Sequence, residues 1–227
     1  VLTLLSLAEL GIGTALNFSL YVPVANKDYE KIKSYMQFYK NAYRAIAAVV
    51  AGLGIALIPF LKFFIKNPGN YEIKELTVYY LIFLFNTVST YFVAYKYSLV
   101  NAEQKNYIQT NVLTITKLVT TVLQIIVLLA TSNFLFYLLT AAFVELVQKI
   151  YVNNYLNKLY PYLLDKDVKP LEKEETAEIV NKTKALVCHK VGDVARLQTD
   201  SIIISSFISV ALVGIVDNYI MVINSIS

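Results

Sequence analysis

Cysteine, histidine and tryptophan are almost missing from this 227-residue sequence, which contains one Cys, one His and no Trp. A single cysteine, Cys188, excludes a disulfide framework and any metal site built from several thiolates. A single histidine, His189, excludes the His-rich metal centres of hydrolases. We therefore expect no metal site and no cofactor.

Charged residues are also scarce, at 16% of the sequence against about 25% in typical soluble domains, whereas hydrophobic residues make up 57%. This composition excludes a disordered chain, a collagen and a charged coiled coil. The formal net charge of +4 is modest, and we expect no nucleic-acid partner. Phosphate-binding loops, dinucleotide-binding glycine motifs, nucleophile elbows and zinc-protease motifs are missing too. We therefore expect no catalytic residues and no enzymatic activity.

The sequence is rich in apolar blocks long enough to cross a bilayer, which takes ~20 residues of helix. We predict an all-α, polytopic transmembrane bundle of about seven spans. The spans cover roughly Val1–Val24, Asn41–Phe64, Leu76–Tyr95, Tyr107–Ala130, Phe134–Leu156, Ala185–Phe207 and the residues from Val210 onward. Because the outer two blocks are apolar up to the termini and the first residue is not Met, we expect both ends to lie within helices of a longer protein.

The connectors between these spans differ in length and charge. We expect a charged connector over Asn26–Lys40, a polar one over Lys96–Asn106, a tight turn over Thr131–Asn133, and a long one over Asn157–Lys184 with a surface helix from Leu171. Lysine and arginine concentrate in the connectors after the first, third and fifth spans. The positive-inside rule places these connectors in the cytoplasm.

Polar residues inside the spans recur at steps of three and four, which places them on one face of a helix. The stripes are His189, Asp193, Arg196 and Asp200; Lys33, Gln37, Lys40 and Arg44; Thr110, Thr114, Lys117, Thr121 and Gln124; Glu145 and Gln148; and Ser6, Glu9 and Gly13. With a rise of ~1.5 Å per residue, Lys117, Glu145 and Arg196 lie near the bilayer centre. A charge facing lipid there is costly, so we expect the stripes to face a shared, solvated cavity.

Each stripe also has a structural interpretation. Asp193, Arg196 and Asp200 would neutralise one another along their helix, and Lys117 and Glu145 would form an ion pair. Lys40 and Arg44, near the predicted membrane edge, would extend toward lipid phosphates. The threonines would donate hydrogen bonds to their own helix backbone.

Three segments resemble a known family. LTLLSLAELGIGTALNFSLYVPVAN (Leu2–Asn26) resembles the second transmembrane helix of bacterial polysaccharide flippases of the Wzx type, which belong to the superfamily of the MATE multidrug exporters and the peptidoglycan-lipid flippase. YKYSLVNAEQKNYI (Tyr95–Ile108) is similar to that family's loop between helices 4 and 5, and HKVGDVARLQTDSIIIS (His189–Ser205) is similar to its seventh helix. The resemblance implies a MATE-like fold of two lobes. Residues 1–157 would be N-terminal-lobe helices without the first helix, 158–184 the cytoplasmic inter-lobe loop, and 185–227 the start of the C-terminal lobe.

The resemblance also implies a function. Such proteins flip undecaprenyl-diphosphate-linked oligosaccharides across the bacterial inner membrane, by alternating access through a charged cavity. The implied partners are this lipid-linked oligosaccharide, the bilayer, a coupling Na⁺ or H⁺, and other polysaccharide-assembly proteins. From the stripes, Lys40, Arg44, Lys117 and Arg196 are candidates for binding the diphosphate. Glu9, Glu145, Asp193 and Asp200 are candidates for ion coupling or for resetting the cavity.

Two alternatives remain open at this point. A MATE-like exporter of cationic drugs would share the fold but should have an acid-dominated cavity. A membrane-embedded polysaccharide polymerase or glycosyltransferase should have large outer loops with clustered charges.

Overall fold

The computed structural model describes residues 12–61, 73–165, 167–184, 192, 203–204 and 210–226, and all regular secondary structure in these ranges is helical. The elements are α2 (Ile12–Ala25), α3 (Tyr29–Leu57), the 3₁₀ turn η2 (Ile58–Phe60), α5 (Ile73–Ala102), α6 (Asn106–Thr131), α7 (Phe134–Leu159), the 3₁₀ turn η3 (Pro161–Leu164), a helix over residues 173–184, and α9 (Val210–Ile226). The expected all-α class is confirmed.

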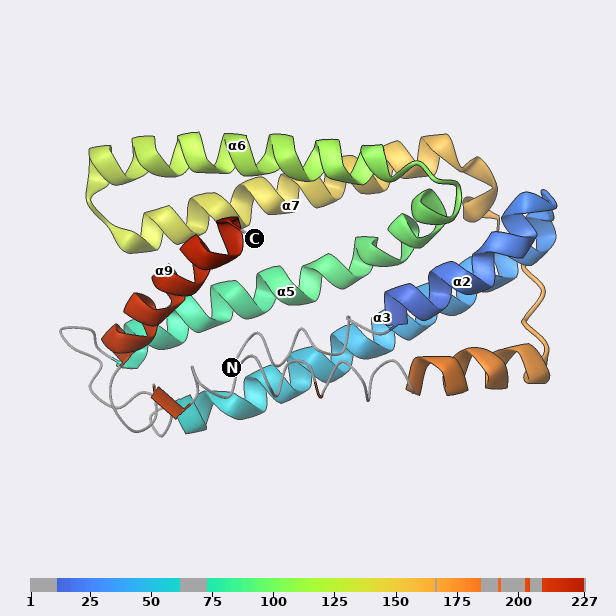
Figure 1. Cartoon of the computed structure of the whole chain (residues 1–227), viewed down its shortest axis with the longest axis horizontal. Helices are drawn as coiled ribbons and strands as arrows, with labels where there is room; N and C mark the ends of the chain where they lie inside the picture. The colour runs from blue at the N-terminus through green and yellow to red at the C-terminus, as the bar shows by residue number, and fades with distance from the viewer. Residues whose placement is uncertain are drawn as a thin grey trace.

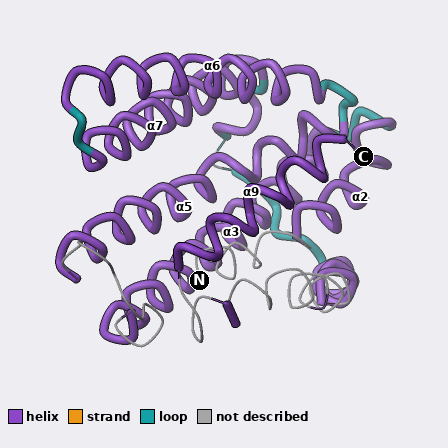
Figure 2. The backbone as a smooth tube through the Cα atoms, turned by 60° about the vertical axis from the view of Figure 1, so that its left-hand side comes forward, coloured by secondary structure: helices purple, strands orange, loops and turns teal. Residues whose placement is uncertain are grey.

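The helices form an elongated bundle in which α5 is central (Figure 1). On one side α5 packs against α2 and α3, and on the other side it packs against α7. Helix α6 lies alongside α7, and the turned view in Figure 2 shows the same pairing. The antiparallel order of α5, α6 and α7 follows from their short connections.

Four of the described helices are long and apolar enough to cross a membrane: Tyr29–Phe60, Lys74–Ala102, Asn106–Thr131 and Phe134–Leu159. They correspond to the second to fifth predicted spans. The first predicted span is described only as α2, the last only as α9, and the span over 185–207 lies outside the described residues except for 192 and 203–204. Length and composition therefore indicate a membrane protein.

The connector after the first predicted span is much shorter than predicted, because α3 begins at Tyr29 and not at Asn41. Asp28 caps the helix, its side chain accepting a hydrogen bond from the backbone N–H of Lys31 at 3.1 Å. Lys33 lies 2.5 Å from Glu30 and 3.2 Å from Asp165. Hydropathy alone predicted a loop over these charged residues. The N-cap at Asp28 and the ion pairs of Lys33 stabilise this stretch as the first turns of α3 instead.

The connector after the third predicted span, expected over Lys96–Asn106, is also shorter than predicted. Helix α5 runs to Ala102 and not to Tyr95, so Lys96 is helical, and it is only 3% exposed. A lysine at this depth is an exception to the rule that charge marks a loop, and its partners are described with the site below.

The turn between α6 and α7 is confirmed. Ser132 adopts a left-handed conformation (φ 50°) that ends α6, and its N–H donates to the carbonyl of Leu128. Asn133 then caps α7 by accepting a hydrogen bond from the N–H of Leu135 at 2.8 Å. Two residues therefore connect two membrane-length helices.

The core between α2, α3 and α5 is rich in tyrosine. Leu20, Tyr39 and Tyr91 are fully buried, one on each of these helices. Near the end of α3, Gly54 packs against Leu84 of α5 so closely that no β-carbon would fit without displacing the leucine. The hydroxyl of Tyr80 donates to the carbonyl of Gly54 at 2.9 Å. Gly54 therefore allows a close helix contact, whereas a β-carbon added at Gly52 would meet no atom of the described residues within 4 Å.

The expected surface helix forms over residues 173–184 and packs on the protruding start of α3. Glu175 pairs with Lys31 at 2.5 Å, and Ile179 is 4% exposed in the same cluster as Ile32 and Tyr35. The ion pair and the buried Ile179 attach the helix over residues 173–184 to the bundle, and the ion pair between Lys33 and Asp165 attaches the preceding part of the connector.

Candidate functional site

A polar cavity of about 730 Å³ lies among α5, α6 and α7 and extends to α2 and α3. Its lining includes Lys117, Thr121 and Gln124 from α6, and Glu145 and Gln148 from α7. These five residues belong to the predicted stripes, so both stripes do face one cavity. We call it the first cavity.

The rest of the predicted α6 stripe does not reach the first cavity. Thr110 and Thr114 are exposed and do not line it, whereas Gln109, Leu113, Thr116 and Thr120 do. The lining face of α6 is therefore rotated by roughly one residue from the predicted stripe, although Lys117 belongs to both. Among the residues of α6, Ile108 is the one whose side chain as a whole is buried by the described bundle.

Three oxygen atoms of the first cavity are buried and have no protein hydrogen-bond partner. They are the side-chain oxygens of Asn17, Asn101 and Thr120. Among the described residues these oxygens have no donor, so each can accept a hydrogen bond from water or from a ligand hydroxyl group. Gln148 completes the polar lining by donating to the hydroxyl of Tyr97 at 3.4 Å.

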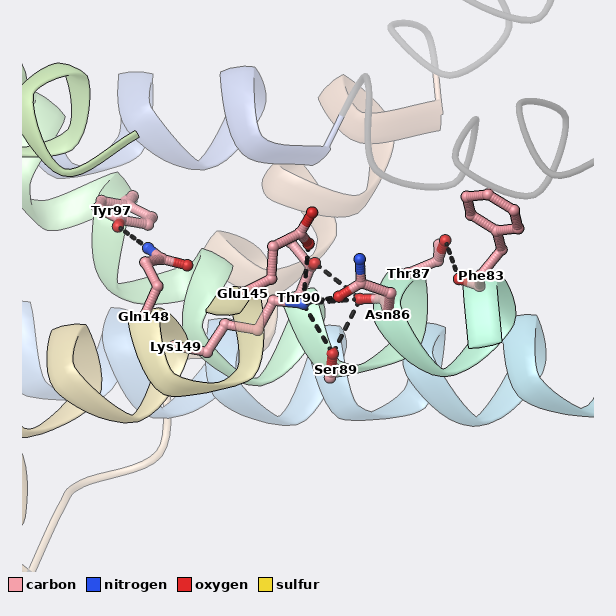
Figure 3. Close-up of polar contacts among 9 residues, drawn as sticks. All are labelled: Phe83, Asn86, Thr87, Ser89, Thr90, Tyr97, Glu145, Gln148 and Lys149. Atoms are coloured by element: carbon pink, nitrogen blue, oxygen red, sulfur yellow. Dashed lines mark hydrogen bonds and ion pairs between the residues drawn. The ribbon is translucent and has the colours of Figure 1, made fainter. Parts of the chain in front are cut away.

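The first cavity is also lined by Lys149, which was not among the predicted site residues. Its ammonium donates to the carbonyl of Asn86 at 2.9 Å, to the amide oxygen of Asn86 at 2.6 Å, and to the hydroxyl of Ser89 at 2.8 Å. Glu145, one helical turn away, lies 3.6 Å from the ammonium. Figure 3 shows Lys149 extending from α7 to these groups on α5.

The predicted ion pair between Lys117 and Glu145 is wrong for the described structure. Glu145 pairs with Lys149 along α7, and Lys117 has no carboxylate within 4 Å among the described residues. Lys117 is exposed at the cavity wall, so its ammonium is accessible to a ligand.

The second cavity, about 460 Å³ in volume, lies among α3, α5, α7 and η3. Lys40 and Arg44 line it together with Lys96 and Lys149. The expectation that Lys40, Arg44 and Lys117 share one cavity is therefore wrong, because the first two line the second cavity and Lys117 lines the first. Lys149 is the cation that lines both.

Lys96 occupies a cage that mirrors the one around Lys149. Its ammonium donates to the amide oxygens of Asn153 at 2.6 Å and Asn157 at 2.5 Å, and to the carbonyl of Asn153 at 3.3 Å. Each of the paired helices α5 and α7 thus inserts one lysine among asparagine oxygens of the other. The hydrogen-bond partners are neutral in both cages. Lys149 has Glu145 as a counter-charge, whereas Lys96 has no carboxylate within 4 Å among the described residues.

A signal for these lysines is present in the sequence. Glu145, Lys149, Asn153 and Asn157 follow one another at steps of four along α7, which places them on one helix face. The stripe was missed because Lys149 was counted with the lysines of the connector that follows the fifth span, although it lies just before that connector, and because the asparagines carry no charge.

Beyond the cavities, Glu103 ties the α5–α6 connector to the end of α7. It accepts hydrogen bonds from Tyr160 at 2.8 Å and from Lys105 at 2.7 Å. Burial raises the pKa of Tyr160 above its usual value, and the contact with Glu103 raises it further. The hydrogen bond to Glu103 likewise raises the pKa of Lys105, so both groups remain protonated and the contact persists at neutral pH.

The remaining predicted site residues, Glu9, Asp193, Arg196 and Asp200, lie outside the described residues, as does His189. In the described part of the chain, no group of three or more His, Cys, Asp or Glu side chains could hold a metal ion.

Comparison of the chain with protein-family models, with curated proteins and with solved structures finds no match. The flippase resemblance therefore rests on the three sequence segments, and the function proposed below rests on the two cavities.

Proposed function

We propose that this protein is a transporter that flips an undecaprenyl-diphosphate-linked oligosaccharide across the bacterial inner membrane for surface polysaccharide synthesis. In this proposal α2, α3, α5, α6 and α7 belong to the N-terminal lobe of a MATE-like, two-lobe protein and α9 to the C-terminal lobe, and a rocking of the lobes alternates access to the substrate. The observation that carries the proposal is the first cavity, where cations and unpaired acceptor oxygens meet between membrane-length helices.

The lining of the first cavity suits an anionic, hydroxyl-rich cargo. The free acceptors of Asn17, Asn101 and Thr120 match the hydroxyl donors of a sugar. Lys117 supplies an accessible positive charge for a phosphate oxygen. Glu145 provides a carboxylate that can hold Lys149 between transport cycles, or bind the coupling Na⁺ or H⁺.

The alternatives fit the described lining less well. An exporter of cationic drugs needs an excess of acids, whereas two lysines and one glutamate line the first cavity. A polysaccharide polymerase needs large outer loops, whereas Ser132 and Asn133 alone connect α6 to α7.

Replacing Lys117 tests the proposal, because it removes the accessible charge without breaking an ion pair of the described structure. We expect Lys117→Gln to lower surface-glycan display on the order of tenfold or more, since a hydrogen bond to a charged group contributes ~1.5–3 kcal/mol. Lys117→Arg, which keeps the charge, should retain part of the activity. The measurement is complementation of glycan display in a flippase-null strain, with protein abundance followed by immunoblot.

Lys158→Gln is the matched control. This lysine lies in the last turn of α7, is exposed, and lines neither cavity, so its loss should leave display unchanged. Normal display by a well-expressed Lys117→Gln variant would eliminate Lys117 as a substrate contact.

A further inference from the structure

The second cavity has an excess of positive charge to which the proposed function assigns no role. Its described lining contains four cations, Lys40, Arg44, Lys96 and Lys149, and no Asp or Glu. Among the described residues, no carboxylate lies within 4 Å of Lys40, Arg44 or Lys96, and the one ion pair of Lys149 is with Glu145, which lines the first cavity. The imbalance therefore belongs to the second cavity itself.

The two buried lysines are fixed in place, which is what a binding site requires. Lys96 is 3% exposed and Lys149 is 8% exposed, and each ammonium is held by three oxygens of neutral groups. Charged groups taken out of water are stabilised by opposite charge as well as by hydrogen bonds. The cage of Lys96 supplies hydrogen bonds alone, and Glu145 is the one carboxylate near Lys149 among the described residues, so an anion in the second cavity would supply the missing negative charge.

The other two cations are placed to reach a ligand. Lys40 and Arg44 lie one helical turn apart on α3 and face the second cavity from the side opposite α7. A guanidinium presents two parallel donors that match two oxygens of a phosphate, and an ammonium adds a point charge. Four positive charges with no acid suit a multivalent phosphate group better than a single carboxylate.

The rim of the second cavity is apolar. Phe92, Ile150 and Leu164 line it and are between 53% and 61% exposed. Phe92 and Ile150 belong to helices of membrane length, where exposed apolar side chains face lipid. A ligand in this cavity can therefore keep a hydrocarbon chain in the bilayer while its head group meets the cations.

We infer that the second cavity is a binding site for the phosphate or diphosphate group of a lipid, held by Lys40, Arg44, Lys96 and Lys149. Two lipids present this chemistry, an anionic membrane phospholipid and an isoprenoid diphosphate. In so far as the phosphate is that of the transported lipid, the inference rests on the proposed function; the site itself does not.

The first test measures binding of inorganic diphosphate to the complete protein, purified in a neutral maltoside detergent, by isothermal titration calorimetry. We expect saturable binding that Lys40→Gln/Arg44→Gln weakens by roughly tenfold or more, because each lost charge-assisted contact weakens binding several-fold. Lys158→Gln, at an exposed lysine that lines neither cavity, should bind within about twofold of the unmodified protein, since it lies away from both.

The double variant should fold, because neither residue has a carboxylate partner in the described structure whose charge would be stranded. The thermal midpoint without ligand checks this point, and Arg44→Gln alone, at an exposed residue, provides a second variant. The absence of diphosphate binding by the unmodified protein, or unchanged binding by a folded double variant, would overturn the inference. Weaker binding in Lys117→Gln and not in the double variant would also overturn it, by placing the anion in the first cavity.

A second arm identifies the source of the phosphate. Native mass spectrometry after incubation with phosphatidylglycerol, phosphatidylcholine or undecaprenyl diphosphate reports which lipid is retained. Retention of phosphatidylglycerol that the double variant loses assigns the site to membrane phospholipid, and retention of undecaprenyl diphosphate alone assigns it to the transported lipid. Equal retention of zwitterionic phosphatidylcholine by both proteins, and of neither anionic lipid, counts against a phosphate site.

These outcomes are separate from those of the export assay. Normal export by Lys117→Gln, together with diphosphate binding that Lys40→Gln/Arg44→Gln loses, would reject the proposed substrate contact and keep the site. Export that depends on Lys117, together with unchanged diphosphate binding in the double variant, would keep Lys117 as a substrate contact and reject the phosphate site in the second cavity.

Discussion

Lys96 and Lys149 show how a lysine can be buried in an apolar bundle without a salt bridge as its main support. Each ammonium has three donors, and each cage offers three acceptors from two polar residues of the facing helix. The same geometry couples the cages to the fold, since removing either lysine leaves amide oxygens buried between α5 and α7. A buried acceptor without a donor is costly, more so than the net contribution of the hydrogen bond it replaces.

We predict that Lys96→Met lowers the free energy of unfolding by about 1–3 kcal/mol, because it leaves the oxygens of Asn153 and Asn157 unpaired. The combination of Lys96→Met with Asn153→Leu and Asn157→Leu should regain most of that loss, because no polar group then remains to be paired. Titration with sodium dodecyl sulfate in mixed micelles measures the change. Lys158→Met is the control and should have little effect, and full stability of Lys96→Met would show that the cage is not structural.

At the scale of the residue, the sequence predicted some features of the site and not others. Lys117 and Glu145 were found because a charge deep in an apolar run is conspicuous, and both do line a cavity. Lys149 was missed because it lies near a basic connector, and hydropathy does not distinguish the last turns of a helix from the loop after it. The pairing of Glu145 with Lys149 is an i,i+4 contact within α7, which the spacing contains. The hydrogen bonds of Lys149 to Asn86 and Ser89 depend on how α5 and α7 pack, which a single-helix pattern does not contain.

At the scale of the element, apolar length predicted the existence of the helices and capping decided their ends. The start of α3 was misplaced by twelve residues, because Asp28 and the ion pairs of Lys31 and Lys33 make a charged stretch helical. The α6–α7 turn was predicted correctly, because Thr131–Asn133 is polar and short between two apolar runs. Glycine spacing alone could not distinguish Gly54 from Gly52, since only the packing of α5 shows which one is in contact.

These two glycines provide a matched test of the α3–α5 contact. Gly54→Val should destabilise the protein by about 1–3 kcal/mol, because the added methyl groups collide with Leu84. Gly52→Val makes the same chemical change two residues earlier, where the backbone faces open space, and should have little effect. Thermal unfolding in detergent measures both, and Leu84→Ala should partly rescue Gly54→Val. Equal midpoints for the two valine variants would contradict the close approach.

At the scale of the whole molecule, the hydropathy pattern predicted an all-helical membrane protein, and the described helices agree. The relative placement of the helices required the structure, because each apolar face could pack against several others. Orientation in the membrane stays a prediction from the positive-inside rule. On that rule, the α6–α7 turn lies outside the cell and the segment before residues 173–184 lies in the cytoplasm.

Cysteine labelling tests this orientation. In a Cys188→Ser background, Ser132→Cys should react with an impermeant maleimide added to intact cells, whereas Lys169→Cys should react only after the membrane is made permeable. Both positions are exposed, so accessibility within the protein is matched. The reverse labelling pattern would refute the orientation and, with it, the family resemblance.

The uninterrupted length of α3 has a mechanical consequence. This helix meets residues 173–184 at Lys31, lines the second cavity at Lys40 and Arg44, and is held against α5 at Gly54. Measured from Gly54, Lys31 is ~35 Å and Lys40 ~21 Å away at 1.5 Å per residue. If α3 pivots at Gly54 as a rigid rod, a displacement of its docked end moves Lys40 by about 0.6 times as much, by the ratio of these two arms. In that movement, a small shift of the helix over residues 173–184 rotates α3 about Gly54, and the displacement of Lys40 and Arg44 widens or narrows the second cavity.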